Sequence, residues 1–562
     1  MSNIVIFFLS FYILLISVIG YGILFQKLCF GSIKDMNDQK VVYTGFYGLF
    51  LLTFISLITS FFLSHNFTHN ILLHSIGIFL FIFLEVKNKK NYLQIILLIS
   101  LIIFSALLIS KTHDDFSYYH LTFTKYLTEQ KVIFGMGILG HGYKLISSLF
   151  FLNSTFYLPF IEYFSFHFSL LFFLIFFNFF IFKELVSKNT HEVIKILYIF
   201  AFSFFNLSFT RISEYGTDKA GQLLIVILTI KLFHYTCFDK TKTKLYNILF
   251  LIPLLGFCIT LKTYFLSYIL LGITIIFLNK EIIKSLKTLF YSKTFVIFLT
   301  FLSFYFLHHF ISTGCLISPM SFTCFGDNLD WARNNNYFKE LSFWLEQWAK
   351  AGAGPNFRVE NPSEYIQKLN WVSHWTEEYF IRKGLDQLGI LISVFLVVFL
   401  IFKKFNLKFK ALVLNQKIFL FYSIILIIFL IWFLKHPSLR YGGYSILFLA
   451  ISIPTALMFS KAANKNLFEN KFKYLAILVI IIFNFKNINR VSSEFKQEGI
   501  FKFDDFPFYT ILDTKFVFEK SLPGLTIYKT NGHCWGTPTP CTGSLKSKIN
   551  VKKKYGYYFL YK

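Results

Sequence analysis

The side chains that could do chemistry stand in short polar segments between long apolar runs. The first segment is HDDFSYYH (113–120), in which the carboxylates Asp114 and Asp115 are adjacent. Either carboxylate could act as a general base toward a hydroxyl group or as a metal ligand. The alternative for each residue alone is a helix N-cap, which accepts backbone N–H bonds of the helix that follows. Both interpretations can hold together, because one carboxylate can cap while its neighbour faces a site.

A second segment, RISEYGTDK (211–219), brings opposite charges into one short loop. Its candidate catalytic carboxylates are Glu214 and Asp218, and its candidate phosphate ligands are Arg211 and Lys219. The alternative is a set of salt bridges within the loop, which contribute little to stability when they are exposed.

Two further loops place cations next to apolar runs. Lys262 stands in TLKTY (260–264), and His436 and Arg440 stand in KHPSLRYGG (435–443). An arginine can bind a phosphate through two parallel hydrogen bonds, so these residues are candidate ligands for a lipid-linked phosphate. For Lys262 the alternative is that its ammonium group extends to lipid headgroups.

Membrane spans must position these loops. Apolar residues make up 55% of the 562 residues and the mean hydropathy is +0.59, a composition that a water-soluble fold could not accommodate. The net charge of +26 could suggest nucleic-acid binding, which needs a basic patch on a folded surface or a basic tail. The lysines instead form short clusters between apolar runs, as in cytoplasmic loops that face anionic lipid. We therefore expect no nucleic-acid partner.

Apolar runs long enough to cross about 30 Å of hydrocarbon predict about fourteen membrane-spanning helices. They lie at roughly 4–26, 43–64, 70–86, 92–110, 157–182, 194–210, 220–237, 245–260, 264–279, 294–311, 388–402, 418–434, 443–460 and 474–485. Lysine clusters occur in every odd-numbered connection and hardly at all in the short even-numbered ones, which makes the odd connections cytoplasmic. Both termini are therefore predicted to lie outside the cytoplasm. The start, MSNIVIFF, lacks the basic stretch that begins a signal peptide, which argues against a cleaved one.

This pattern predicts an all-α polytopic transmembrane bundle with two parts that fold outside the membrane. Residues 1–311 hold the first ten spans and an outer loop at 111–156, and residues 387–485 hold the last four. A helical outer loop domain is predicted at 312–386, and a small α+β outer segment at 486–562. We expect the protein in the inner (plasma) membrane of a bacterium, with both termini in the periplasm.

Four of the seven cysteines fall in the predicted outer parts, as two close pairs. GCLISPMSFTC contains Cys315 and Cys324, and CWGTPTPC contains Cys534 and Cys541. Disulfides persist in oxidising compartments such as a periplasm, so we predict the pairs Cys315–Cys324 and Cys534–Cys541. Closing such a short loop stabilises a segment by about 2–3 kcal/mol. The alternative is a zinc site with His533 as a third ligand, but we predict no metal there.

Five of the seven tryptophans also fall in the predicted outer loop domain: Trp331, Trp344, Trp348, Trp371 and Trp375. Trp344 and Trp348 stand one helical turn apart beside Leu341 and Leu345, which predicts an amphipathic helix at the membrane interface. Stacking against a sugar ring is the alternative for one or two of these rings.

With its many spans and charged outer loops, the chain resembles the GT-C superfamily of membrane glycosyltransferases. The resemblance rests on HDDFSYYH (113–120), supported by the second charged segment and by the loops of Lys262 and Arg440. It implies a polyprenyl-phosphate sugar donor at the outer face, with an acidic residue of the first large outer loop as base or metal ligand. Asp114 or Asp115 would take that role here, and Lys262 and Arg440 would bind the lipid phosphate. In that superfamily the acidic loop usually follows the first helix, whereas four predicted spans precede it here.

We therefore expect an inverting transfer of a sugar from a polyprenyl-phosphate donor to a glycan or lipid acceptor. The partners would be this donor, the acceptor and membrane lipids. The residues do not identify a cofactor, and a divalent cation at the carboxylates is the one candidate. One alternative is an O-antigen-type polymerase or ligase that relies on Arg440 and His436. Another is a flippase or transporter of lipid-linked glycans, for which Glu162 and His167 are the best ionisable candidates near a span.

Overall fold

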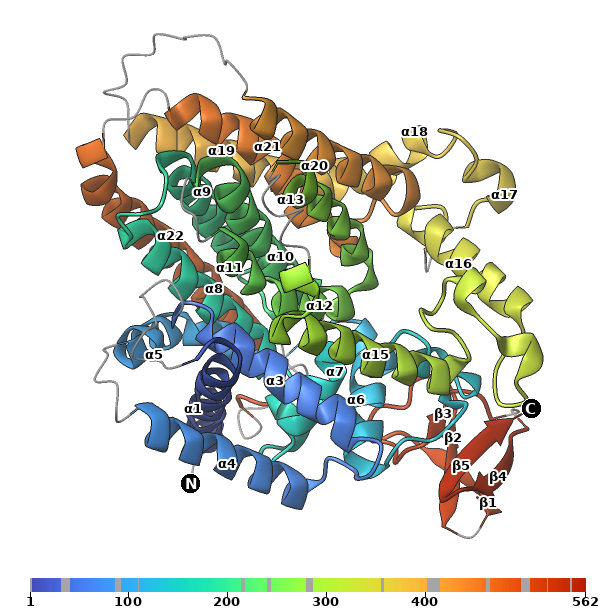
Figure 1. Ribbon diagram of the computed structural model, residues 1–562. Coiled ribbons are helices and arrows are strands. Elements are labelled where there is room, and N and C mark those ends of the chain that lie inside the picture. The colour runs from blue at the N-terminus through green and yellow to red at the C-terminus, as the bar shows by residue number, and fades with distance from the viewer. Residues whose placement is uncertain are drawn as a thin grey trace.

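The computed structural model describes residues 3–31, 41–85, 92–109, 111–213, 218–239, 244–278, 287–354, 358–401, 415–460, 465–496, 506–522, 524–545 and 548–561. Helices dominate these residues and form one bundle, with the few strands at one side of it (Figure 1). The strands all belong to the part of the chain that begins at Phe516.

Nine helices within these ranges are long and apolar enough to cross a membrane. They are Asn3–Phe30, Phe67–Leu84, Glu162–Val186, Asp218–Phe238, Lys293–Thr313, Val372–Leu400, Gln416–Lys435, Gly443–Ser460 and Lys471–Phe495. Each of them overlaps one predicted span. The other five predicted spans overlap shorter helices, namely Thr44–Thr59, Tyr92–Leu107, Glu192–Ser208, Asn247–Leu261 and Thr263–Ile275. The chain is thus a protein of many apolar helices, and the figure of fourteen spans stays a prediction.

Two helices form the centre of the bundle. α8 (Phe168–Val186) and α10 (Asp218–Phe233) are buried along almost their whole length. They pack against each other, and α10 also packs against α12 (Ile252–Leu261) and α21 (Gly443–Ser460). A helix that is surrounded by other helices is apolar around most of its circumference, as these two sequences are apart from a few buried polar residues.

Peripheral helices expose large apolar side chains. Leu396 on α19 (Leu385–Ile401) and Leu430 on α20 (Gln416–Lys435) are exposed, and α22 (Lys465–Phe495) carries a similar row. Large apolar faces are unfavourable in water, whereas lipid tails accommodate them. These faces therefore support the membrane class.

Glycines let the first helices approach one another closely. α1 (Asn3–Phe30) packs against α3 (Thr44–Thr59) and α4 (Phe67–Glu85). A Cβ atom at Gly20 would lie only 2.0 Å from the carbonyl oxygen of Gly77, so no larger residue fits at this crossing. Small residues serve this purpose in membrane proteins, because burial away from lipid contributes little to helix association there.

A buried ion pair, not predicted from the sequence, joins the two central helices near their C-terminal ends. Lys231 Nζ on α10 lies 2.8 Å from Glu184 Oε1 on α8, and the side chains are only 1% and 2% exposed. Thr190 donates a hydrogen bond to the other carboxylate oxygen, at 3.0 Å. A buried charge without a partner is strongly destabilising, so this pair links α8 to α10.

Residues 111–156 fold into short helices that pack against the bundle. They are the π-helical turn η3 (Phe116–His120), α6 (Leu121–Glu129), η4 (Met136–Ile138), η5 (His141–Tyr143) and α7 (Ser148–Thr155). Leu121, Phe123 and Leu127 of α6 are buried, so this helix lies inside the protein. The other short helices are α5 (Tyr92–Ile103), η2 (Phe104–Leu107), η6 (Glu162–Ser165), η8 (His234–Phe238), α11 (Lys244–Leu249), η9 (Thr263–Leu271), α13 (Gly272–Leu278) and η13 (Leu439–Tyr441).

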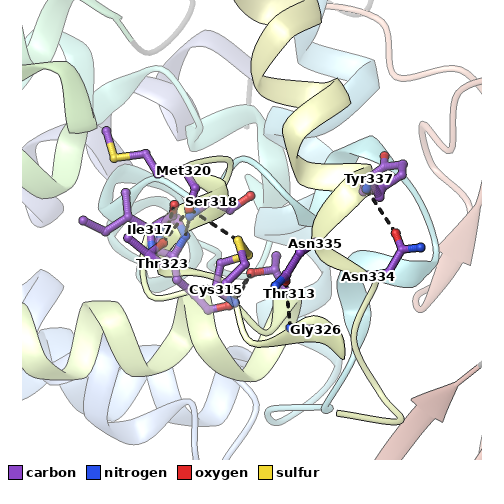
Figure 2. Close-up of a disulfide and its surroundings, with 12 residues drawn as sticks. Thr313, Cys315, Ile317, Ser318, Met320, Thr323, Gly326, Asn334, Asn335 and Tyr337 are labelled. Carbon is purple, nitrogen blue, oxygen red and sulfur yellow. Dashed lines mark hydrogen bonds between the residues drawn. A yellow bond between two sulfur atoms is a disulfide. The ribbon is translucent and has the colours of Figure 1, made fainter. Parts of the chain in front are cut away.

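A disulfide closes a short loop directly after α15 (Lys293–Thr313). Cys315 and Cys324 are bonded, as predicted (Figure 2). The elements that follow are η10 (Ser321–Thr323), η11 (Gly326–Asn328), α16 (Asn335–Ala349), α17 (Pro362–Tyr365), α18 (Val372–Trp375) and the π-helical η12 (Thr376–Gly384). η12 continues directly into α19, so the predicted span at 388–402 is the second half of a longer helical stretch.

The C-terminal segment is a small β structure. Its strands are β1 (Phe516–Leu522), β2 (Leu525–Thr530), β3 (Cys541–Thr542), β4 (Asn550–Lys554) and β5 (Tyr557–Tyr561). β1 and β2 are antiparallel, β3 runs parallel to β2, and β4 and β5 form a separate hairpin. The predicted disulfide between Cys534 and Cys541 is present. Phe134 exchanges backbone hydrogen bonds with Tyr558 and Leu560 of β5, which attaches the hairpin to residues 111–156.

Candidate functional site

Arg440 joins two carboxylates that are far apart in the chain. Its Nε donates to Asp218 Oδ2 at 2.8 Å, and its second terminal nitrogen donates to Asp115 Oδ2 at 2.6 Å. Lys262 forms an ion pair with the other oxygen of Asp218. Four predicted site residues from four segments thus meet in one cluster, which we call the charged cluster: Asp115, Asp218, Lys262 and Arg440.

Helix ends position the members of the charged cluster. Asp218 is the first residue of α10, where a negative charge is favoured by the helix dipole. Lys262 directly follows α12, and Arg440 lies in η13 between α20 and α21. Asp115 immediately precedes η3. Four polypeptide segments therefore turn at the same end of the bundle, which lets their polar side chains meet without breaking a span.

The four side chains of the charged cluster differ in their exposure to solvent. The Asp218 side chain is 2% exposed, whereas those of Arg440, Lys262 and Asp115 are 19%, 22% and 25% exposed. A buried carboxylate needs a cation and hydrogen bonds to remain stable, and Asp218 has both. Asp218 is therefore the buried carboxylate of the cluster, and Asp115 is the more exposed one.

The two neighbouring aspartates of HDDFSYYH have different surroundings. Asp114 is exposed, and Asp115 turns toward Arg440. Asp115 occupies the N-cap position of η3, but its side chain makes no capping hydrogen bond there. The N-cap interpretation is therefore wrong for Asp115, because the carboxylate is engaged by the guanidinium instead.

Neighbouring side chains adjust the protonation of Asp115. Burial acts to raise the pKa of its carboxyl, but the charge and hydrogen bond of Arg440, together with the neighbouring histidines, hold that pKa below its usual value. The Tyr119 hydroxyl also donates to Asp115 Oδ2, at 3.3 Å. His113 accepts the Asp115 backbone N–H at 3.0 Å through Nδ1, and burial together with Arg440 lowers the His113 pKa. At neutral pH the charged cluster thus holds an ionised carboxylate beside a neutral imidazole.

The loop that carries Arg440 is fixed from several sides. The Gln222 side chain of α10 donates to the carbonyl of Leu439 at 3.2 Å and accepts the backbone N–H of Ser445 at 3.0 Å. The Trp375 indole donates to the carbonyl of Pro437 at 2.9 Å, and the Tyr379 hydroxyl accepts the Leu439 N–H, also at 2.9 Å. These bonds leave little freedom to the backbone beside Arg440.

Sequence reasoning missed these positioning residues. A signal was present for Trp375, because tryptophans are concentrated in residues 312–386. No local pattern marked Gln222 or Tyr379, since their partners lie in a distant loop.

The remaining candidate cations lie outside the charged cluster. Lys219 is buried and donates to the carbonyls of Phe209 and Arg211, at 3.2 and 2.6 Å. Its ammonium group therefore satisfies the end of α9 (Glu192–Ser208), where a positive charge is favourable. Arg211 is exposed, and Glu214 falls outside the described residues.

His436 lies beside the charged cluster, with its ring 6.1 Å from that of Tyr441. Burial lowers its pKa to about 4, so the imidazole is neutral at pH 7. A neutral imidazole can donate one hydrogen bond but brings no positive charge to a phosphate. The Tyr441 ring also contacts Lys262. The Lys262 ammonium lies 4.6 Å from the centre of this ring.

Carboxylates and histidines near Asp115 also raise the question of a metal ion. Within the ranges that the structure describes, no three His, Cys, Asp or Glu side chains are arranged to hold one. Two of the carboxylate oxygens that could bind a divalent cation already accept hydrogen bonds from Arg440.

The fold and the charged cluster define a class: a polytopic α-helical membrane protein with a partly accessible ionic site at one end of its bundle. The chain belongs to the family of the domain of unknown function DUF8201, whose model matches residues 4–448. The match contains the whole charged cluster and ends before the β segment. No curated protein and no solved structure matches the chain.

Proposed function

We propose that this protein is a membrane glycosyltransferase that uses a polyprenyl-phosphate sugar at the outer face of a bacterial inner membrane. The observation that carries the proposal is the bridge from Asp115 through Arg440 to Asp218. It combines an accessible carboxylate, needed to activate a hydroxyl group, with cations that suit a phosphate leaving group. Two disulfides agree with an oxidising compartment on that side.

In the proposed reaction Asp115 accepts the proton of an acceptor hydroxyl group. The hydroxyl oxygen forms a bond to the anomeric carbon of the donor sugar, and the bond from that carbon to the phosphate oxygen breaks. The electron pair leaves with polyprenyl phosphate, and the configuration at the anomeric carbon inverts. Lys262 and Arg440 stabilise the leaving phosphate, and positioning at the boundary of water and lipid supplies much of the rate.

The balance of charge in the cluster refines this mechanism. Two carboxylates and two cations face one another, so a donor phosphate would compete with a carboxylate for the cations. Asp115 is the more exposed carboxylate and the one to be displaced. Once its pairing with Arg440 is lost, its pKa rises because Arg440 no longer opposes the effect of burial, and the carboxylate becomes a stronger base. Donor binding would thus activate Asp115.

The test compares the two adjacent aspartates in membranes that contain the protein. Asp115→Asn is expected to lower transfer from a radiolabelled polyprenyl-phosphate sugar by at least 100-fold, because general-base catalysis typically contributes about 10²–10⁴-fold. Asp114→Asn is the matched control and should retain most of the activity, since Asp114 is exposed. Wild-type activity of the Asp115→Asn protein at equal expression would refute the proposal.

An O-antigen-type polymerase or ligase is the second candidate, because Arg440 lies at the centre of the cluster. This candidate predicts that activity survives the loss of both Asp114 and Asp115 but not the loss of Arg440. Glycosyl transfer by the first mechanism predicts that Asp115 and Arg440 are both essential.

A further inference from the structure

Three aromatic side chains from distant segments lie around η3, the turn that directly follows Asp115. Tyr118 stands three residues after it on η3 and is 40% exposed. The His533 ring lies 5.1 Å from the Tyr118 ring, and His533 Nδ1 is 2.8 Å from the hydroxyl oxygen of Ser117. The Tyr337 hydroxyl accepts a hydrogen bond from Lys144, and Gly142, two residues before Lys144, packs against the backbone of Tyr118, so Tyr337 lies in the same region.

The Cys315–Cys324 disulfide lies at the start of the segment that positions Tyr337. Figure 2 shows the Cys315–Cys324 loop beside the start of α16. The backbone N–H of Gly326 donates to the Asn335 side chain at 3.1 Å, and the Asn334 side chain caps α16 by accepting the Tyr337 N–H at 3.0 Å. These contacts fix the first turn of α16, which carries Tyr337.

Two cations contact the Tyr337 ring. The Lys144 ammonium lies 4.4 Å from the ring centre, and the Arg333 guanidinium lies 4.8 Å from it. The Lys144 ammonium also donates to the Tyr337 hydroxyl. Cations over an aromatic face are attracted by its negative charge density, so the ring is oriented before any ligand arrives.

The Cys534–Cys541 disulfide helps to position the neighbouring residue His533. The loop that Cys534 and Cys541 close is bound to residues 111–156 by several hydrogen bonds. The backbone N–H and the hydroxyl group of Thr539 donate to the Glu129 carboxylate, at 2.6 and 2.8 Å. The Cys541 N–H donates to the Tyr143 hydroxyl at 3.2 Å. His533, which directly precedes this loop, is thereby held against η3.

We infer that Tyr118, Tyr337 and His533 form a subsite that binds a sugar ring of the acceptor next to Asp115. An aromatic ring offers an apolar face to the C–H groups of a sugar, while phenol and imidazole edges can bond its hydroxyl groups. Ligand sites combine apolar surface with a few directed polar groups in this way. A lipid chain would not need the phenol, imidazole and ammonium groups that surround these rings. The inference rests on the proposed function, which supplies the assumption that the protein has an acceptor substrate. It adds that this acceptor is a glycan.

The experiment measures glycan binding by the full-length protein in detergent, without any lipid-linked donor. Fluorescently labelled protein is applied to a printed array of bacterial and other oligosaccharides. The wild type is expected to bind at least one printed glycan, and Tyr118→Ala and His533→Ala should each weaken that binding at least tenfold. Tyr118→Phe keeps the ring and should stay within about threefold of the wild type, because the apolar face that packs against the sugar is unchanged. Tyr555→Ala is the matched control, because Tyr555 is a highly exposed tyrosine at the turn between β4 and β5.

The outcomes separate this inference from the proposed function. A wild-type protein that binds no glycan, or Tyr118→Ala and His533→Ala proteins that bind like the wild type, would overturn the subsite. Thermal unfolding of each variant shows whether a loss of binding is a loss of fold, and His533→Ala keeps the test decisive if Tyr118→Ala unfolds, because His533 is exposed. The transfer assay on Asp115→Asn tests the proposed function independently, because the binding assay requires no turnover.

Discussion

Arg440 Nε lies 2.8 Å from Asp218 Oδ2, although 222 residues separate the two in the chain. The contact joins the loop between α20 and α21 to the first residue of α10. Asp218 is almost fully buried, so its charge is tolerated only because Arg440 and Lys262 neutralise it. The same guanidinium then reaches Asp115. The stability of the bundle end and the geometry of the candidate site therefore depend on one side chain.

Replacement of Arg440 should affect both stability and activity. Arg440→Gln leaves the buried Asp218 with Lys262 alone and is expected to destabilise the protein by about 3–5 kcal/mol. Arg440→Lys keeps the charge but cannot bridge two carboxylates in the same geometry, so it should retain more stability than activity. Thermal unfolding in detergent and the transfer assay measure the two effects.

Arg382→Gln is the matched control for Arg440→Gln. Arg382 is 66% exposed and pairs with Glu378 one helical turn away, so its loss should cost less than about 1 kcal/mol. Equal shifts of the melting temperature in the two variants would contradict the structural role assigned to Arg440.

The stability contributed by Asp115 should depend on pH. Burial acts to raise its pKa, but Arg440 holds the folded-state pKa below the unfolded value of about 3.9. The unfolded chain then binds more protons in this range, so the contribution is complete above about pH 4–5 and is lost as the pH falls through the folded pKa. The difference in melting temperature between wild type and Asp115→Asn should therefore be constant near neutrality and shrink in acid. A difference that stays the same down to about pH 3 would be evidence against this pairing.

The buried pair of Glu184 and Lys231 can be tested by single and double replacement. Glu184→Gln leaves the Lys231 ammonium buried without its counter-charge and is expected to destabilise the protein by about 3–5 kcal/mol. Glu184→Gln combined with Lys231→Met removes both charges and should recover much of that loss. Monodispersity and melting temperature in detergent provide the measurement. A double variant that is less stable than either single variant would show that the pair itself stabilises the fold.

Thiol counting tests the cysteine arrangement. Cys29, Cys237 and Cys258 are thiols outside any disulfide, and the other four cysteines form two disulfides. Labelling of the denatured, unreduced protein should therefore modify only these three, and labelling after reduction should modify all seven. Labelling of Cys315 or Cys534 without reductant would contradict the disulfides.

Local sequence features predicted much of the scaffold. Continuous apolar runs predicted the helices, because a helix in lipid must satisfy its own backbone and present apolar side chains outward. Sequence proximity predicted the two disulfides, since a loop of nine or fewer residues brings its cysteines together with little help from the rest of the fold. Each predicted span overlaps a described helix, but five of these helices are too short to count as crossings by length, and the helix Val372–Leu400 begins well before its predicted span.

The roles within the charged segments could not be read from the sequence. Asp218 and Lys219 are neighbours at the start of α10, yet Asp218 binds Arg440 while Lys219 binds carbonyls at the end of α9. Successive residues of a helix point in directions about 100° apart, so neighbours contact different elements. Likewise, Asp114 and Asp115 are adjacent residues of the same type in the sequence. Only the position of Arg440 in the folded protein distinguishes them.

The sequence by itself determined that the chain is a membrane protein of many apolar helices with two short disulfide loops, because hydrophobicity and chain proximity act locally. Only the tertiary structure decided which charges meet. Arg440 lies 222 residues from Asp218 and 325 from Asp115, and it reaches both because four helix ends pack at one end of the bundle. The physical reason is burial: Asp218 is enclosed by the packed helices, and an enclosed carboxylate requires the cations that the same packing supplies.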